Sequence, residues 1–155
     1  MKNIIKCTLA FLAAALLAGC VEVSHGGTYI DQHDDNAVET FVIRQVLEFD
    51  PMNPTGIDIQ PYFEELFSGI TLTIYYENGK IAYAEFSNGS LPFSPVDYKL
   101  PEGKVACTYD DGCYPPVLRL ADGNVLAKMV YYEPVFEFSL DFKNISYKYT
   151  FKAAK

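Results

Sequence analysis

The sequence predicts an antiparallel all-β domain of about nine strands, built either as a β-sandwich or as a closed barrel. From Val38 onward, short runs of β-branched and aromatic residues alternate with Gly, Asn, Asp and Pro, as is typical of strands joined by turns. Twelve Tyr and eleven Phe supply large side chains for a core, although the chain has no Trp. Near the C-terminus, apolar and polar residues alternate without a break, which indicates a hairpin with one buried face.

Nine stretches have the length and composition of strands and are bounded by turn residues. The expected strands are Val38–Phe49, Ile70–Glu77, Lys80–Ser87, Val96–Leu100, Lys104–Thr108, Val117–Leu120, Val125–Tyr132, Val135–Phe142 and Ile145–Phe151. Alternation cannot distinguish a filled sandwich from a lipocalin-like barrel, so both architectures stay open.

One short helix is expected after the first strand, over Pro61–Ser68. Pro suits the first turn of a helix, the two glutamates at positions 64 and 65 suit its positive end, and Gly69 suits its end. The residues with helical spacing are Phe63, Leu66 and Phe67. The helix is therefore expected to cover one end of the sheet structure.

Two hairpins can be aligned from the sequence. Asn78–Gly79 tolerates positive φ at both turn positions, so a two-residue turn there pairs Leu72 with Glu85. Glu85 is then the one carboxylate on an apolar face, and it is either functional or explained by a sheet end or a bulge. A turn at Lys143–Asn144 places a row of Phe and Tyr on one face of the C-terminal hairpin, which strongly restricts the register.

Residues 1–19 have the three-part layout of a secretory signal. Lys2 and Lys6 make the start basic, an apolar stretch runs from Leu9 to Leu17, and small residues follow. A membrane-spanning helix needs about 20 apolar residues, and this stretch is shorter. The segment is therefore expected to direct export and not to span the membrane.

The signal ends in Leu17-Ala18-Gly19-Cys20, which resembles the lipobox of bacterial lipoproteins. The resemblance covers residues 1 to 20 and implies cleavage before Cys20 and acylation of its sulfur and its new amine. More than one acyl chain anchors a protein stably, which an acidic domain needs because anionic headgroups do not attract it. Many lipoproteins of the inner membrane have Asp where Val21 stands, so the resemblance favours the outer membrane, with the leaflet left open.

These features divide the chain into three regions. Residues 1–19 are the signal peptide, residues 20–36 are the lipidated N-terminus and a flexible tether, and residues 37–155 are a single all-β domain. The tether is glycine-rich, polar and acidic, a composition that cannot bury enough apolar surface to become ordered. The layout resembles that of small Gram-negative envelope lipoproteins whose mature domains have no assigned activity.

Cleavage and acylation leave two cysteines in the mature chain, Cys107 and Cys113. They flank a short turn-like segment, and exported proteins enter a compartment in which thiols oxidise. The sequence therefore predicts a disulfide between them. A zinc or redox site would need a ligand spacing and nearby histidines that this segment lacks.

The sequence contains no recognisable catalytic constellation. Both histidines, His25 and His33, lie in the tether, and there is no Gly-x-Ser-x-Gly elbow for a nucleophilic serine. His33 and its neighbouring aspartates lack a standard metal spacing, and the Asp-Gly turns at 110–112 and 122–124 do not continue into calcium loops. No enzymatic activity, cofactor or metal is therefore expected. A pair of catalytic carboxylates that are close in the fold but distant in the sequence would show no such motif.

Charge and aromatic content set the expected partners. A net charge of -8 and a pI near 4.6 argue against a nucleic-acid partner. Tyr75–Tyr76 and Tyr131–Tyr132 each place one ring on either side of a strand, where an outward ring can stack on a ligand. We expect a non-enzymatic ligand-binding or accessory domain at the outer membrane, with a small molecule, a glycan or an envelope protein as its partner. The alternative is a structural envelope protein that assembles through a strand edge.

Overall fold

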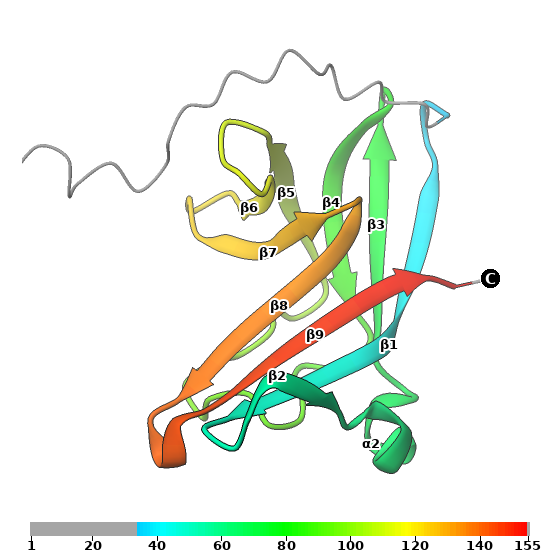
Figure 1. The fold of residues 1–155 in the computed structure, drawn as a ribbon. Helices are drawn as coiled ribbons and strands as arrows, with labels where there is room; N and C mark the ends of the chain where they lie inside the picture. The colour runs from blue at the N-terminus through cyan, green and yellow to red at the C-terminus, as the bar shows by residue number, and fades with distance from the viewer. Residues whose placement is uncertain (1–33, 155) are drawn as a thin grey trace, which may run out of the picture.

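A computed structural model describes residues 34–154 (Figure 1). The signal peptide, Cys20, both histidines and most of the expected tether lie outside the described residues. The described strands are β1 (Val38–Asp50), β2 (Asn53–Asp58), β3 (Thr71–Glu77), β4 (Lys80–Phe86), β5 (Lys104–Asp110), β6 (Val117–Leu120), β7 (Val125–Val130), β8 (Glu133–Leu140) and β9 (Ile145–Ala153). The helical elements are η1 (Gln60–Tyr62), α2 (Glu64–Phe67) and η2 (Phe142–Asn144), and none is long and apolar enough to cross a membrane.

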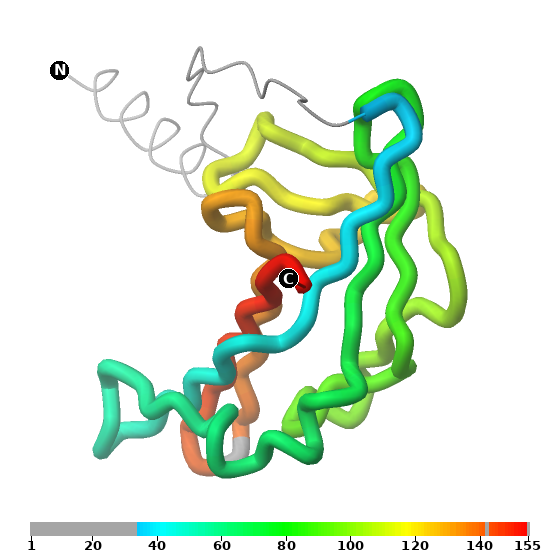
Figure 2. The backbone as a smooth tube through the Cα atoms, turned by 90° about the vertical axis from the view of Figure 1, so that its right-hand side faces the viewer, coloured from blue at the N-terminus to red at the C-terminus, as the bar shows by residue number. Residues whose placement is uncertain are grey.

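The strands close into a barrel. Antiparallel neighbours follow the order β1-β3-β4-β5-β6-β7-β8-β9, and β1 pairs with β9 to complete the ring. β2 lies outside this ring and pairs with the end of β1. The predicted all-β fold with a short helix is confirmed, and of the two architectures the chain adopts the barrel. Figure 2 shows β1 running beside the long β3–β4 hairpin.

Large side chains fill the interior of the barrel and one of its ends, which is the lower end in the view of Figure 1. Tyr149 is fully buried, and its hydroxyl donates a hydrogen bond to the carbonyl of Pro92 in the loop that follows β4. Phe67 of α2 lies 6.5 Å from the Tyr149 ring, and Tyr98 of the same loop lies 4.3 Å from Phe138. The other largest buried side chains are Phe151, Leu72, Ile74, Leu118, Val46 and Pro134. The loop and α2 therefore cover this end with aromatic side chains, while the opposite, upper end carries the turns described below.

The C-terminal hairpin keeps its predicted faces but has a different register. Phe138 pairs with Tyr147 and not with Tyr149, because the turn takes four residues where two were expected. The shift is an even number of residues, so the aromatic row still points into the barrel. Ser139, on the other face, is exposed as expected.

The β3–β4 hairpin has the predicted Asn78–Gly79 turn, but the predicted pairing of Leu72 with Glu85 is wrong. A bulge beside Tyr75 and Tyr76 shifts the register by one residue, so Leu72 pairs with Phe86. A single-residue shift moves every later side chain of β4 to the other face. Glu85 consequently lies opposite Thr73 on the outer surface, so the bulge explains its apparently apolar position.

Two further predictions of secondary structure are corrected. Residues 96–100 do not form a strand: they lie between Pro95 and Pro101 in the loop over the lower end, and Val96 is 99% exposed. β2 was not predicted, because Pro54 and Gly56 are unfavourable inside strands and are tolerated at an edge. The expected helix is split into η1 and the single turn α2.

Candidate functional site

Glu85 belongs to a surface cluster on β3, β4 and β5. The Tyr75 hydroxyl donates a hydrogen bond of 2.5 Å to its carboxylate, which raises the pKa of Tyr75. Lys104 pairs with Glu85 across the strands, and its Nζ lies 3.8 Å from the centroid of the Tyr75 ring. The Tyr75 hydroxyl thus satisfies the carboxylate, and Lys104 lies over the Tyr75 ring in a cation–π contact, which is the pattern of a structural surface group. Tyr76 faces inward, so this pair has one ring on each side as predicted.

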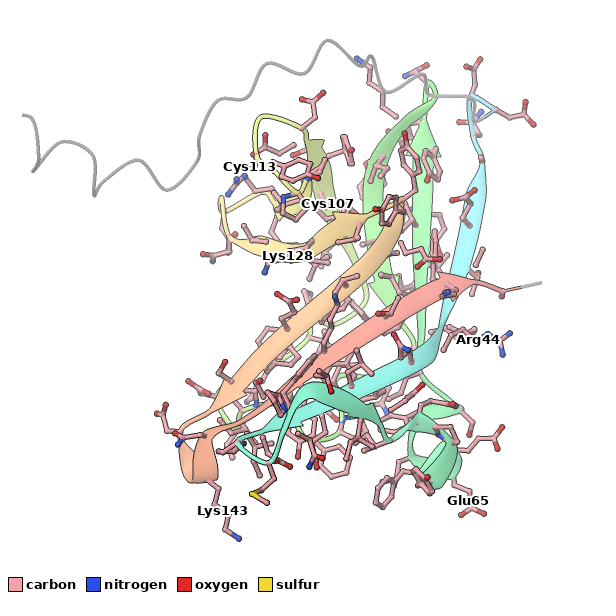
Figure 3. All side chains as sticks on the ribbon, viewed as in Figure 1. Arg44, Glu65, Cys107, Cys113, Lys128 and Lys143 are labelled. Atoms are coloured by element: carbon pink, nitrogen blue, oxygen red, sulfur yellow. The ribbon has the colours of Figure 1, made fainter. Side chains whose placement is uncertain are left out.

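Cys107 and Cys113 are not joined by a disulfide in the structure, unlike the prediction. Cys107 is buried and faces the interior from β5, whereas Cys113 lies in the loop between β5 and β6 (Figure 3). Cys113 Sγ lies 3.9 Å from Nη2 of Arg119. Arg119 of β6 lies opposite Thr108 of β5 in the strand register. Because adjacent strand residues point to opposite faces, Thr108 and Arg119 face away from Cys107. The two thiols therefore have different environments.

The two cysteines should differ in reactivity. Iodoacetamide should modify Cys113 in the folded protein and Cys107 only after unfolding, because the thiolate is the reactive form and burial raises the pKa of Cys107 to about 11. Mass spectrometry of peptides from native and unfolded samples measures both sites. If neither thiol of the exported protein reacts until a reductant is added, the disulfide forms and this expectation is wrong.

A groove lined by tyrosines lies at the upper end of the barrel. We call it the tyrosine groove and define it by its lining residues, Tyr109, Tyr114, Pro115, Pro116, Met129, Val130, Tyr131 and Tyr132. They come from the end of β5, the loop before β6, the end of β7 and the β7–β8 turn, and they surround about 290 Å³. Tyr114, Tyr131 and Tyr132 are 85%, 91% and 63% exposed. The groove thus presents several aromatic rings to solvent.

Tyr131 and Tyr132 form the turn itself, which corrects their prediction as strand residues. Both have positive φ, 51° and 66°, and they join Val130 to its partner Glu133 as a two-residue loop. The β3–β4 turn has nearly the same geometry, with φ of 51° at Asn78 and 71° at Gly79. Asn-Gly is favoured in this conformation, whereas a bulky side chain there is strained. The chain therefore has tyrosines at a turn whose geometry favours other residues.

Exposure distinguishes this turn from another strained aromatic residue. Phe93 also has a positive φ, of 62°, but its ring stacks on Tyr147 with a centroid distance of 5.3 Å. Packing can offset the local strain at Phe93. Tyr131 has little such compensation, because nearly all of its surface is exposed. Strain of this kind costs about 1–3 kcal/mol per residue and clusters at functional sites.

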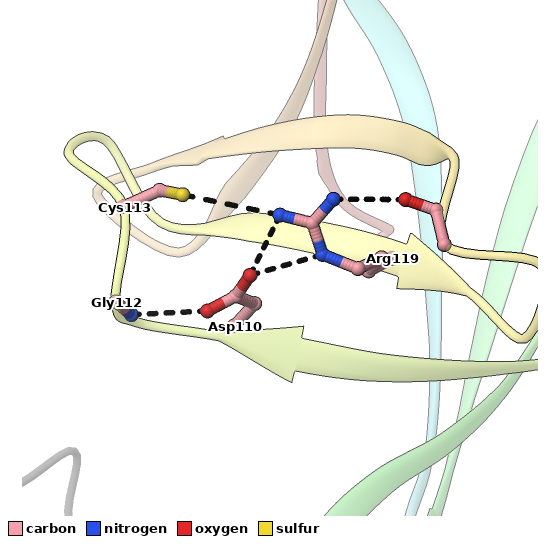
Figure 4. A network of polar contacts seen from close by, with 5 residues as sticks. Asp110, Gly112, Cys113 and Arg119 are labelled. Atoms are coloured by element: carbon pink, nitrogen blue, oxygen red, sulfur yellow. Dashed lines mark hydrogen bonds and ion pairs between the residues drawn. The ribbon is translucent and has the colours of Figure 1, made fainter. Parts of the chain in front are cut away.

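Arg119 holds the loop that carries Tyr114 (Figure 4). Its guanidinium donates two hydrogen bonds to Asp110 Oδ2, at 2.7 and 3.0 Å, and one to the Gly123 carbonyl at 2.9 Å. The other oxygen of Asp110 accepts the backbone N–H of Gly112, and the Arg119 and Gly112 bonds hold the pKa of Asp110 below its usual value. Paired bonds from one guanidinium fix geometry as well as charge. The loop is therefore pinned at its start.

A second contact fixes the other end of this loop. The backbone N–H of Met129 donates a hydrogen bond of 2.7 Å to the carbonyl of Pro116.

Tyr109 is less exposed than the other tyrosines of the groove. Burial, the neighbouring Tyr132 and the charge of Asp111 raise the pKa of Tyr109. Its hydroxyl consequently stays protonated at neutral pH and can donate a hydrogen bond.

The Asp-Gly turns are explained by their own hydrogen bonds. Asp122 accepts the backbone N–H of Asn124 at 2.9 Å and its side-chain amide at 2.8 Å, as Asp does in a tight turn. Within residues 34–154, no three His, Cys, Asp or Glu side chains gather where they could hold a metal ion. The tyrosine groove is thus the strongest candidate site of the described chain.

No family model, curated protein sequence or solved structure matches the chain. What the groove can bind therefore follows from its own chemistry.

Proposed function

We propose that the chain is a non-enzymatic binding module, held by lipid at the outer membrane, whose ligand binds in the tyrosine groove. The observation that carries the proposal is the exposed Tyr131–Tyr132 turn, with positive φ at both residues. The same barrel makes an equivalent turn from Asn78–Gly79 without that strain. Tyrosines at this turn reduce stability but present their rings to a ligand. Residues that lower stability in this way are common at functional sites.

The filled interior also favours binding at the surface. The fully buried side chains of Leu72, Ile74, Leu118 and Tyr149 belong to the core that fills the barrel. A small molecule enclosed in the barrel would have to displace them. The tyrosine groove is open and offers ring faces together with hydroxyl groups, which suit stacking combined with orienting hydrogen bonds.

Tyr114→Ala should weaken ligand binding at least about tenfold, because exposed aromatic residues carry much of the energy at binding sites. The measurement is binding of the purified full chain to an array of extended peptides and neutral oligosaccharides. Tyr62→Ala is the matched control, since Tyr62 is 77% exposed but lies beside α2 at the other end of the barrel. Equal binding by the wild type and both variants, or no binding by the wild type, would contradict the proposal.

The lipid anchor rests on the lipobox resemblance at Leu17-Ala18-Gly19-Cys20. Cys20→Ala should abolish labelling by a fatty-acid probe and leave the precursor uncleaved, because the thiol is the acceptor of the first lipid. Cys7→Ala is the matched control, since it also removes a cysteine from the signal segment. Equal labelling of the wild type and the Cys20→Ala protein would refute the anchor.

A specific observation also supports assembly through a strand edge as a second candidate function. β4 and β5 pair only at Tyr83–Glu85 with Lys104–Ala106, and beyond these pairs a groove of about 360 Å³ lies between the strands. Separated strand edges can accept a further strand. A photoreactive residue in place of the exposed Thr108, which lines this groove, should crosslink to an added strand, whereas one in place of Tyr62 should not.

A further inference from the structure

The lining of the tyrosine groove restricts the chemistry of its ligand. The groove contains tyrosines, prolines, Met129 and Val130, and no carboxylate, amide or basic side chain lines it. A site that selects a sugar needs placed polar groups for the sugar hydroxyls, and here only the tyrosine hydroxyls and the backbone supply them. The lining therefore favours a ligand with apolar ring-sized units and few hydrogen-bonding groups.

A polyproline II helix has these properties. It has three residues per turn and no internal hydrogen bonds, so its carbonyls point outward and can accept bonds from tyrosine hydroxyls. When such a segment is rich in proline, its pyrrolidine rings fit between aromatic side chains. Several peptide-binding domains recognise proline-rich segments in aromatic-lined grooves. Tyr114, Tyr131 and Tyr132 supply exposed rings, and the less exposed Tyr109 also lines the groove.

Charge around the groove favours a basic ligand. Asp111 is exposed and near enough for its charge to act on Tyr109, which lines the groove. Glu133 directly follows Tyr132, but Lys152 lies 3.7 Å from its carboxylate and offsets its charge, so the preference for a basic ligand rests on Asp111. The chain as a whole carries a net charge of -8. Complementary charge raises the rate of encounter and selects against acidic partners.

The groove is also held in place before a ligand arrives. Arg119 and the Met129–Pro116 hydrogen bond fix the loop, and the two-residue turn fixes the backbone of Tyr131 and Tyr132. A polyproline II segment is likewise partly ordered when free. Association of two preformed surfaces loses less conformational entropy than the ordering of flexible chains.

The geometry points to a basic, proline-rich peptide segment in the polyproline II conformation as the ligand of the tyrosine groove. This inference rests on the proposed function, because it names the ligand class of the same site. The prolines stack against the exposed tyrosine rings, the tyrosine hydroxyls donate to the peptide carbonyls, and a flanking Lys or Arg lies beside Asp111.

The test titrates the full chain, purified in detergent, with a fluorescent peptide of consecutive prolines flanked by arginines. Matched probes replace the prolines by alanine or the arginines by glutamate, and a neutral oligosaccharide is the fourth probe. The proline-arginine peptide should bind, and Tyr131→Ala should weaken it at least about tenfold. Asp111→Asn should weaken it less, with a smaller salt dependence. Tyr62→Ala should leave the affinity unchanged.

The outcomes separate the inference from the proposed function. Absence of binding by the proline-arginine peptide, or equal binding of its alanine analogue, overturns the inference. If the oligosaccharide or the alanine peptide binds and Tyr131→Ala weakens that binding, the proposed function stands with another ligand class. If no probe binds in a manner that depends on Tyr131, both fall.

Discussion

Tyr149→Ala should lower the free energy of unfolding by about 3–5 kcal/mol, the usual range for removing a large buried ring. Tyr149 is fully buried, and its ring lies 5.8 Å from Phe138 and 6.4 Å from Tyr147. The substitution opens a cavity and leaves the Pro92 carbonyl without its hydroxyl donor. Because a domain of this size has only about 5–15 kcal/mol in total, urea denaturation should show a greatly lowered midpoint.

Two companion variants separate the causes of this loss. Tyr149→Phe removes only the hydrogen bond to Pro92 and should cost about 1 kcal/mol. Ser139→Ala changes an exposed side chain on the outer face of β8 and should cost less than about 0.5 kcal/mol. If Tyr149→Ala costs no more than Ser139→Ala, the barrel interior is not packed as described.

Replacing the tyrosine turn by Tyr131→Asn together with Tyr132→Gly should raise the free energy of unfolding by about 1–2 kcal/mol. The positive φ of both residues is strained for tyrosine and is favoured by Asn-Gly. The loss of contacts should be small because Tyr131 and Tyr132 are 91% and 63% exposed. The same double variant should lose affinity for the proline-arginine peptide at least about tenfold.

The β3–β4 turn provides the reciprocal control. Asn78→Tyr puts a tyrosine at a φ of 51°, the same value as at Tyr131, and should destabilise the protein by about 1 kcal/mol. Equilibrium unfolding of both variants and the wild type measures the two changes. A double variant less stable than the wild type would mean that Tyr131 and Tyr132 are retained for the fold and not for binding.

Most strands were predictable because apolar residues at alternate positions must share one buried face. Such alternation is present in β9, where Tyr147, Tyr149 and Phe151 all point inward. It does not predict the register of β4, because the bulge between Tyr75 and Tyr76 adds an unpaired residue that alternation does not mark. It also fails for β2, whose Pro54 and Gly56 are acceptable only because the strand lies at an edge.

The candidate site was the least predictable part of the chain. Tyrosine favours strands, so its preference predicts that Tyr131 and Tyr132 extend the strand before them, although their neighbours Val130 and Glu133 pair across a tight turn. No local signal predicts positive φ for two consecutive tyrosines. Disagreement between local preference and structure is expected at functional sites, where a sequence departs from the rules that stabilise the fold. The sequence predicts one outward-facing ring in this pair, whereas the turn exposes both.

The most direct test of the binding site is a nuclear magnetic resonance titration of the full chain with isotope-labelled tyrosine rings. The probes are the proline-arginine peptide and a neutral oligosaccharide. The account predicts that the probe that binds shifts the signals of Tyr114, Tyr131 and Tyr132, which line the tyrosine groove. Shifts confined to Tyr83, which lines the groove between β4 and β5, or no shift with either probe, would contradict it.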